Sequence, residues 1–346
     1  EEDPRNQLYL NFIRFLDEFR PKAFVIENVS GLLSMSKGAV LEDILKHITE
    51  LGYSADVHTL HAADYGVPQN RKRIFIVGGS HGLKVKAPNP THSNQSECLS
   101  QSSIFEVNNL SRAVTVKDAI SDLSKIPVVS PKQTQTKLSY NDVSPQSDYQ
   151  IEMRNNGECL FHHSVKQMLS IRRLRLAMLR PGDYGKDISK RTLEDGLPYK
   201  VIDEILSGGG MIRDYKGCRA QDIEKEMKLR ELLHEGHHDI NEILNSLDSG
   251  GFANKYRRLH WEKQSHTLVA HMARDCSDFV HPDQDRFISV REAARLQSFS
   301  DKYIFFGSQF QQFKQIGNAV PPKLAYAVAQ SIISSLSLTV AVASAA

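Results

Sequence analysis

A carboxylate and an amide directly follow an apolar run near the start of the chain. Glu27 and Asn28 come after residues 23–26, which are all apolar. Such a run is typical of a strand covered on both faces, and ligands of open α/β sheets bind outside the carboxyl ends of these strands. A carboxylate at the edge of an apolar layer tends to share a proton, because burial raises its pKa. We expect either an acid–base site here or a Glu27 that only caps the next helix.

The elements that would position these side chains form a recognisable order. Apolar residues recur at helical spacing after Pro4, and a second helical pattern covers residues 40–48. Strand patterns cover residues 23–27, 53–61 and 74–79. The order helix, strand, helix, strand, strand is that of the second half of a doubly wound sheet with a closing hairpin. No glycine-rich strand-to-helix turn that could bind a nucleotide-like cofactor is present.

Composition excludes several classes of protein. The 346 residues suffice for one large domain or two, and no apolar run could span a bilayer. The net charge of +2 does not by itself indicate a nucleic-acid partner. Only local basic patches can support such a partner. The four cysteines lie far apart without a Cys-x-x-Cys pair, which fits reduced thiols better than disulfides or a zinc site.

The middle of the chain is polar and contains two charged features. Residues 88–150 are rich in Ser, Gln, Asn and Pro, so we expect a long excursion with mobile parts and one helical piece at residues 116–123. Residues 163–180 form a basic helical pattern, whose charged face either is solvated or contacts phosphate. His234-Glu235-Gly236-His237-His238 matches a zinc-peptidase pattern, but Gly236 weakens the required helix. We expect no metal there.

The last third of the chain mixes basic, aromatic and β-forming residues. Arg257, Arg258, Thr267 and Leu268 stand in such a stretch, which favours a strand and loop facing nucleic acid. Residues 289–299 have the pattern of an amphipathic helix. Residues 315–322 are expected to form a loop that leads into a final helix.

Five short motifs, taken together and in order, resemble the cytosine-5 DNA methyltransferase family. They are Asp3-x-Arg5-x-x-Leu8, Glu27-Asn28-Val29, Gln69-x-Arg71-x-Arg73, Arg291-Glu292-Ala293-Ala294-Arg295-Leu296-Gln297-Ser298-Phe299 and Gln315-Ile316-Gly317-Asn318-Ala319-Val320-Pro321. Each motif is weak alone, but independent causes for all five over nearly the whole chain are very improbable.

The resemblance implies an α/β fold. The chain would be the C-terminal part of a doubly wound S-adenosylmethionine-dependent methyltransferase sheet, with a smaller mixed target-recognition domain inserted. Residues 1–80 would be the second half of the cofactor and catalytic domain, and residues 81–285 the target-recognition domain. Residues 286–346 would hold the small-domain helix and the return to the catalytic domain.

The resemblance also implies a reaction. A cysteine adds to carbon 6 of a flipped cytosine, carbon 5 accepts the methyl group of S-adenosyl-L-methionine, and a base removes the carbon 5 proton. Addition places negative charge on ring nitrogen 3 and the 2-carbonyl oxygen. Glu27 would contact nitrogen 3, Arg73 the 2-carbonyl, and Arg71 would shape the pocket, since a guanidinium stays charged and presents a fixed fork. Asn28 would orient the site.

By the same resemblance, other residues would bind cofactor and DNA. Leu8 would pack on the adenine, and Asn318 and Ala319 would approach the amino-acid end of the cofactor. Double-stranded DNA would be the partner, with Thr267 and Leu268 near the base-reading loop. Flipping a base costs a few kcal/mol, which phosphate and groove contacts would offset.

One departure from the family pattern bears on activity. The Pro-Cys nucleophile loop and the glycine-rich cofactor turn are absent, and none of the four cysteines follows a proline. We therefore expect a complementary N-terminal methyltransferase half or subunit, and an exposed backbone edge on the strand at residues 23–27.

Three functions follow from these patterns. The first is a DNA cytosine-5 methyltransferase of restriction-modification, cytoplasmic in a bacterium or nuclear in a eukaryote. The alternatives are a non-catalytic DNA-binding or regulatory subunit and a tRNA cytosine-5 methyltransferase.

Overall fold

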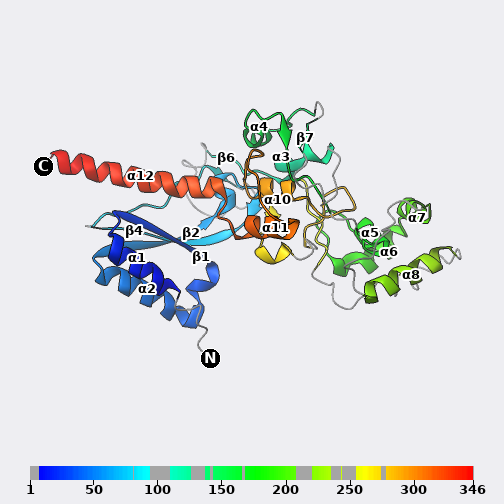
Figure 1. Cartoon of the computed structure of the whole chain (residues 1–346), viewed down its shortest axis with the longest axis horizontal. Helices are drawn as coiled ribbons and strands as arrows, with labels where there is room; N and C mark the ends of the chain where they lie inside the picture. The colour runs from blue at the N-terminus through cyan, green and yellow to red at the C-terminus, as the bar shows by residue number, and fades with distance from the viewer. Residues whose placement is uncertain are drawn as a thin grey trace. The chain divides into compact units, whose positions relative to one another are not determined.

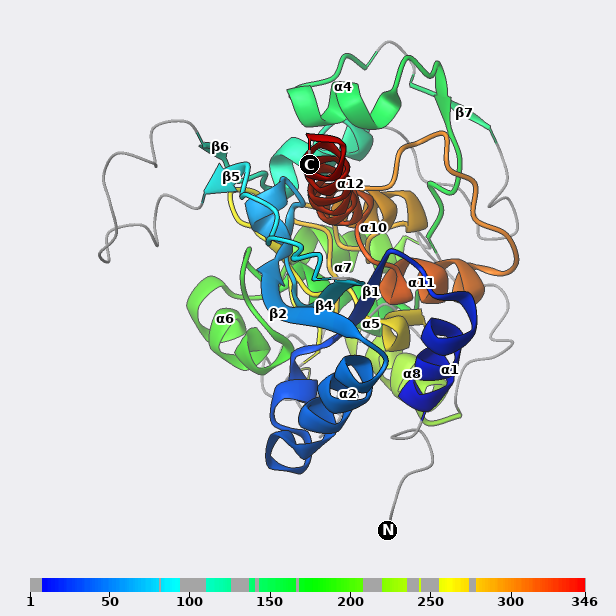
Figure 2. The same ribbon diagram turned by 90° about the vertical axis from the view of Figure 1, so that its left-hand side faces the viewer.

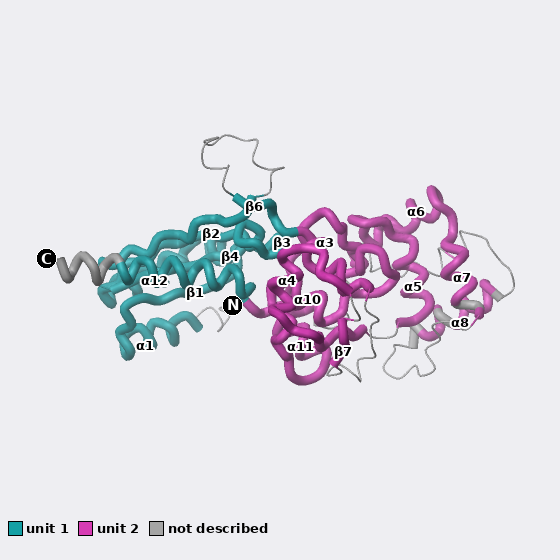
Figure 3. Tube along the Cα trace, turned by 90° about the horizontal axis from the view of Figure 1, so that it is seen from above, with its two compact units in different colours: residues 1–114, 320–346 teal, residues 115–319 magenta. Residues whose placement is uncertain are grey.

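The computed structural model divides the chain into two compact units (Figure 3). The described residues are 8–80, 82–93, 110–125, 137–140, 143–165, 168–207, 220–234, 243, 255–273 and 278–345. Unit 1 comprises Glu1–Val114 and Val320–Ala346, and unit 2 comprises Thr115–Ala319. These boundaries differ from the expected divisions after residues 80 and 285. Leu83 and Val85 pack into the core of unit 1, which extends that unit beyond residue 80.

A three-stranded sheet forms the centre of unit 1. It contains β1 (Ala23–Val29), β4 (Lys72–Ser80) and β2 (Tyr53–His61), in the order β1-β4-β2. β4 is antiparallel to both neighbours, so β1 and β2 point the same way and their carboxyl ends lie at one edge of the sheet. The antiparallel pairing of β2 and β4 agrees with the expected hairpin.

The expectation that β1 is a parallel strand covered on both faces is wrong for the described chain. Its only described neighbour, β4, is antiparallel, and no other described strand pairs with it. Val25 is 42% exposed and Val29 is 52% exposed. β1 is therefore an edge strand among the described residues. An exposed backbone edge was expected for residues 23–27.

Helices cover both faces of the sheet (Figures 1 and 2). Side chains alternate along β4, so Ile74 and Ile76 face one side and Phe75 and Val77 the other. The first pair packs with α1 (Tyr9–Phe19) and α2 (Ala39–Glu50). The second pair packs in the cluster that includes Leu324 and Val328 of α12 (Pro322–Ala345). The predicted helices therefore form the two outer layers.

Short elements connect the layers of unit 1. They are the 3₁₀ helices η2 (Ser30–Leu33), η3 (Met35–Gly38) and η4 (Ala62–Tyr65), and the two-residue strands β3 (Gln69–Asn70), β5 (His92–Ser93) and β6 (Ser111–Arg112).

Unit 2 is mainly helical. Its elements are α3 (Val116–Ile120), η6 (Leu123–Lys125), β7 (Leu138–Ser139), α4 (Asp148–Arg154), β8 (Cys159–Leu160), α5 (Ser170–Ala177), η8 (Gly185–Asp187), α6 (Ile188–Asp195), α7 (Tyr199–Leu206), α8 (Ala220–His234), β9 (Ser265–His266), η9 (Ala270–Ala273), α10 (Val290–Leu296) and α11 (Gln309–Asn318). The helical piece predicted at residues 116–123 is confirmed. Residues 94–109, 126–136 and 141–142 of the segment expected to have mobile parts lie outside the described residues.

Helix α10 is buried on every side, so the expectation of an amphipathic helix is wrong. Its charges are paired instead of solvated. Arg295 donates to Asp122 and to both oxygens of Asp301, at 2.6–3.0 Å. Glu292 accepts two bonds of 2.8 Å from Arg286. A buried charge persists only when it is paired and hydrogen-bonded, and these pairs meet that condition.

The loop expected at residues 315–322 is shorter than predicted. Helix α11 continues to Asn318, and Ser308 caps its start by accepting a hydrogen bond from the N–H of Gln311. The final helix begins at Pro322, close to the predicted position. Among the described residues, no helix has the length and apolar character that a membrane crossing requires.

Candidate functional site

Glu27 and Arg73 form an ion pair at the carboxyl-end edge of the unit 1 sheet. The Nε atom of Arg73 lies 3.0 Å from Oε1 of Glu27. Val29 stands opposite Arg73 in the β1–β4 register, so Glu27 is the diagonal neighbour of Arg73 on the same face. The Glu27 side chain is 29% exposed and that of Arg73 is 12% exposed. The strand-end carboxylate therefore bonds a guanidinium at a partly open position, and η2 begins without a side-chain cap.

Arg71 lies close to this pair and is almost fully buried, at 2% exposure. Its carbonyl accepts a 2.8 Å bond from the N–H of Ala62, which fixes the chain just before β4. Burial, and then the charge of Arg73, lower the pKa of Arg71 to about 10, while Glu27 opposes the shift. Burial also lowers the pKa of Arg73, again opposed by Glu27. Both guanidinium groups stay charged at neutral pH, and this positive pair can stabilise negative charge that develops on a bound ligand.

Asn28 does not join the Glu27–Arg73 pair. Successive side chains of a strand point to opposite faces, so Asn28 points away from the face of Glu27. Its Oδ1 atom accepts a 2.8 Å bond from the N–H of Val29. The Asn28 side chain therefore does not contact the Glu27–Arg73 pair, and its expected orienting role stays a prediction.

The expected cofactor residues fall in different units. Leu8 of unit 1 precedes α1 and is 61% exposed, so its side chain is available for an apolar ring. Asn318 and Ala319 end unit 2, as the last residue of α11 and the residue that caps it. The carbonyl of Ala319 accepts a 2.6 Å bond from Nε2 of Gln297, which holds the chain at the helix end.

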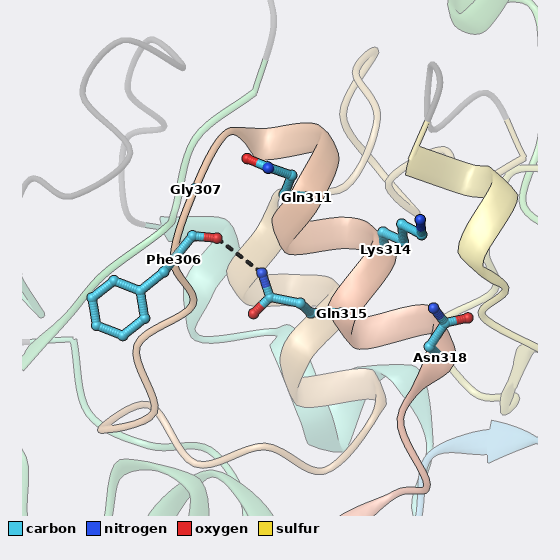
Figure 4. Close-up of a pocket in the computed structure, with 6 residues that line it drawn as sticks. All are labelled: Phe306, Gly307, Gln311, Lys314, Gln315 and Asn318. Carbon is cyan, nitrogen blue, oxygen red and sulfur yellow. Dashed lines mark hydrogen bonds between the residues drawn. The ribbon is translucent and has the colours of Figure 1, made fainter.

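A pocket of about 480 Å³ lies along α11 in unit 2 (Figure 4). It is lined by Phe306, Gly307, Gln311, Lys314, Gln315 and Asn318. Nε2 of Gln315 donates a 2.9 Å bond to the carbonyl of Phe306 across the pocket wall. The lining amides and the Lys314 ammonium can hydrogen-bond a carboxylate or another polar ligand.

Sequence reasoning found Asn318 but missed the rest of this pocket. A signal was present, because residues 311, 314, 315 and 318 are all polar and follow the i, i+3, i+4, i+7 spacing of one helix face. Because residues 315–322 were expected to form a loop, residues 315 and 318 were not assigned to a helix face.

Two of the four expected DNA-binding residues, Arg258 and Leu268, are buried within unit 2, and their expected role stays a prediction. The Arg258 guanidinium donates to the carbonyls of Leu176 and His281 and to Oδ1 of Asp285, at 2.6–2.8 Å. Arg258 therefore stabilises the fold of unit 2. The Leu268 side chain is also fully buried. Arg257 and Thr267 are partly exposed, and their expected role stays a prediction.

The basic pattern at residues 163–180 is mostly neutralised within unit 2. Arg173 pairs with Glu204 and Arg180 pairs with Asp195, while Arg175 is buried. Helix α5 covers only Ser170–Ala177, and Lys166 lies outside the described residues. Of the two alternatives left open, these ion pairs favour the solvated face over phosphate contact for Arg173 and Arg180, because both carry an internal counter-charge.

Metal-binding side chains do not cluster within the part of the chain that the structure describes. No group of three or more His, Cys, Asp or Glu residues there could hold an ion. Residues 235–238 of the zinc-peptidase pattern lie outside the described residues, so the expectation for that segment stays a prediction.

Comparison with known proteins adds close relatives. Type II methyltransferase M.AgeI of Thalassovita gelatinovora is 55% identical over 337 residues, which cover 96% of this chain and 78% of that protein. M.DdeI of Desulfomicrobium norvegicum is 32% identical, with 96% of this chain and 68% of that protein covered. DNA (cytosine-5)-methyltransferase PliMCI of Paracentrotus lividus is 33% identical, with 95% and 22% covered.

A solved structure supports the fold. It is described as a DNA modification methyltransferase encoded within a prophage of E. coli, and it covers 97% of this chain and 76% of its own. The TM-score is 0.57 at 21% sequence identity, a likeness that concerns the fold alone. The family model of C-5 cytosine-specific DNA methylases matches residues 1–334. With nearly its whole length matched, the chain belongs to the C-5 cytosine-specific DNA methylase family.

Proposed function

We propose that this chain carries the base-activating part of a DNA cytosine-5 methyltransferase that acts on double-stranded DNA in restriction-modification. The ion pair between Glu27 and Arg73 carries the proposal, because it places a carboxylate and a guanidinium side by side at a partly open sheet edge. The type II methyltransferase names of M.AgeI and M.DdeI support the restriction-modification setting, and their source organisms favour a bacterial cytoplasm.

In this proposal the pair acts on the pyrimidine ring of a flipped cytosine. Glu27 holds a proton against ring nitrogen 3, and Arg73 donates to the 2-carbonyl oxygen. Negative charge on these two ring atoms is then offset by groups that the sheet holds in place before the substrate arrives. Arg71 raises the positive potential at the same edge, and its burial keeps the guanidinium in one position.

The cofactor of the proposed reaction is S-adenosyl-L-methionine, which supplies the methyl group when bound. The described residues fit such a ligand in two respects. Leu8 exposes apolar surface, which suits packing on an adenine ring. Asn318 lines a pocket with polar walls, which suits hydrogen bonds to an amino-acid end, and Ala319 follows it in the chain.

The sulfur nucleophile, in this proposal, comes from outside these 346 residues, on the same polypeptide or on another. None of the four cysteines follows a proline, and Cys159, on β8 of unit 2, is the one that the structure describes. Among the described residues, the free edge of β1 is compatible with a further strand, because unpaired strand edges bind further strands. Val25 and Val29 give this edge an apolar surface.

Methyl transfer from tritiated S-adenosyl-L-methionine tests the proposal. The chain is assayed alone and mixed with the part of M.AgeI that it does not match, on duplex DNA and on tRNA. We expect incorporation into duplex DNA with the mixture only. Activity of the chain alone would contradict a nucleophile from outside these 346 residues. Preference for tRNA would contradict duplex DNA as the substrate. No incorporation with either nucleic acid would favour a non-catalytic DNA-binding subunit.

A further inference from the structure

Two segments of unit 2 that are far apart in sequence lie side by side. The N–H of Gly182 donates to the carbonyl of Arg258, and the N–H of Arg258 donates to the carbonyl of Asp183, at 2.9 and 3.0 Å. The N–H of Gly185 donates to the carbonyl of Lys255 at 2.7 Å. These backbone bonds join the loop after α5 to residues 255–258.

This pairing brings two cations onto one aromatic ring. The Arg257 Cζ atom lies 4.9 Å from the centre of the Tyr184 ring, and Lys186 Nζ lies 5.4 Å from the same centre. Distances within about 6 Å are those of cation–π contacts. We call Tyr184, Lys186 and Arg257 the Tyr184 cluster.

The cluster differs from the other cations of this region in having no carboxylate partner. Arg191 pairs with Asp183, Arg180 with Asp195 and Arg258 with Asp285. Neither Lys186 nor Arg257 forms an ion pair with any residue that the structure describes. A cation that the fold leaves without a counter-charge can bind an external anion without first breaking an internal pair.

The backbone also directs Arg257 away from the interior. Tyr256 and Arg258, which flank Arg257, are buried, whereas Arg257 is partly exposed. The Arg258 side chain points inward, where backbone carbonyls and Asp285 hold its guanidinium. Arg257 is therefore directed outward, and the Tyr184 ring restricts its guanidinium to one side.

Three titratable groups lie near the cluster, and of these Asp187 keeps its negative charge. Asp183 is taken by Arg191, and Asp187 accepts a 2.9 Å bond from the N–H of Tyr184. Burial, with a smaller contribution from Arg257, lowers the pKa of His266 to about 3. His266 is thus neutral at physiological pH, and the positive charge of the cluster comes from Lys186 and Arg257.

We propose that the Tyr184 cluster binds phosphates of the duplex backbone and thereby positions the DNA for the proposed methyl transfer. This inference rests on the proposed function. Arg binds phosphate through two parallel hydrogen bonds, and Lys binds it as a point charge. Such contacts fix the register of a protein on DNA without reading its sequence, so they suit a pair of cations whose positions the fold sets.

Salt dependence of binding to a fluorescent duplex tests the cluster, measured by anisotropy with the full 346-residue chain. Each phosphate contact releases counterions, so Lys186→Gln and Arg257→Gln should each reduce the slope of log K against log salt by about 0.9. The double variant should show the sum of the two reductions in slope. Arg257→Lys keeps the charge and should keep the slope. Arg180→Gln is the matched control, because the Arg180 charge is already paired, and its slope should equal that of the wild type.

Three outcomes overturn the inference. The first is a double variant with the wild-type slope, and the second is a control that loses as much as the cluster variants. Either leaves the proposed function intact, because tritium transfer into DNA reports on it separately. The third is a wild-type chain that binds no duplex, which overturns the cluster as a DNA site. Thermal melting of each variant verifies that the fold is retained.

Discussion

Glu27 on β1 and Arg73 on β4 are diagonal neighbours across an antiparallel strand pair, with 3.0 Å between Oε1 and Nε. They are 46 positions apart in the sequence and meet because β4 lies between β1 and β2 and runs against both. The start of β4 therefore lies beside the end of β1. This arrangement gives the sheet edge an acid, a guanidinium and, in Arg71, a second buried guanidinium.

Removing the carboxylate of Glu27 should abolish most methyl transfer. Glu27→Gln keeps the size of the side chain but loses its acid, so we expect a rate at least about 100-fold lower, the usual scale for general acid–base groups. Tritium incorporation into duplex DNA by the complemented chain measures it. Glu18→Gln, at an exposed position of α1, is the control and should retain the wild-type rate. Equal rates for the two variants would contradict the role of Glu27.

The geometry of Arg73 should matter as well as its charge. Arg73→Lys keeps a positive charge but loses the planar fork, so methyl transfer should fall, on the order of 100-fold, as for a lost oxyanion donor. The loss should be in kcat more than in KM, because the interaction strengthens as charge develops on the ring. Steady-state kinetics would separate the two. An Arg73→Lys variant with wild-type kcat would show that charge alone suffices.

The buried network around α10 should dominate the stability of unit 2. Asp301→Asn removes one counter-charge of Arg295 and one of the two Asp301 acceptor oxygens that Arg295 contacts, which should cost about 3–5 kcal/mol of unfolding free energy. The matched control is Asp195→Asn, in an exposed ion pair with Arg180, which should cost about 0–1 kcal/mol. Urea unfolding measures both. Similar costs for the two variants would contradict a structural role for the network.

The same network gives a pH dependence of defined sign. Charged and hydrogen-bonded arginines, with Arg295 foremost, outweigh burial and lower the pKa of Asp301 below 3.8. The unfolded chain then binds a proton that the folded chain does not, so stability from this group is present above about pH 4 and is lost as the pH falls further. Asp301→Asn should lack this part of the acid loss. An unchanged acid slope in urea unfolding would contradict it.

His266 should contribute a separate loss of stability in weak acid. Burial lowers its pKa from 6.5 to about 3, so the unfolded chain takes up a proton below pH 6.5 that the folded chain refuses. Stability should fall by up to about 1.4 kcal/mol per pH unit between these values. His266→Phe keeps a ring to stack on Phe279 and removes the titration. If wild type and variant lose stability equally between pH 6 and pH 4, the account of His266 is wrong.

Local patterns predicted the elements of unit 1 well. Apolar runs, alternation and helical spacing located α1, β1, α2, β2, β4 and α12, because each of these elements packs apolar side chains against the core. They could not predict that β4 inserts between β1 and β2, since strand order depends on contacts that are distant in sequence.

Charged residues were the main source of error. The sequence predicted that Arg258 and the charged residues of α10 face solvent or DNA, but they are buried. A charged residue in a sequence gives no sign of whether a buried partner exists. Their partners, among them Asp122, Asp285 and Asp301, lie between 6 and 173 positions away. The motif residues Glu27, Arg71 and Arg73 were located by resemblance, and their mutual proximity follows from the register of β1 and β4.

The mass of the methylated nucleoside tests the central claim most directly. Duplex DNA incubated with S-adenosyl-L-methionine, this chain and the complementary part of M.AgeI would be digested and analysed by mass spectrometry. We predict 5-methyl-2′-deoxycytidine with the wild-type chain and almost none with Glu27→Gln. A methyl group on an exocyclic nitrogen, or an undiminished yield with Glu27→Gln, would contradict the account.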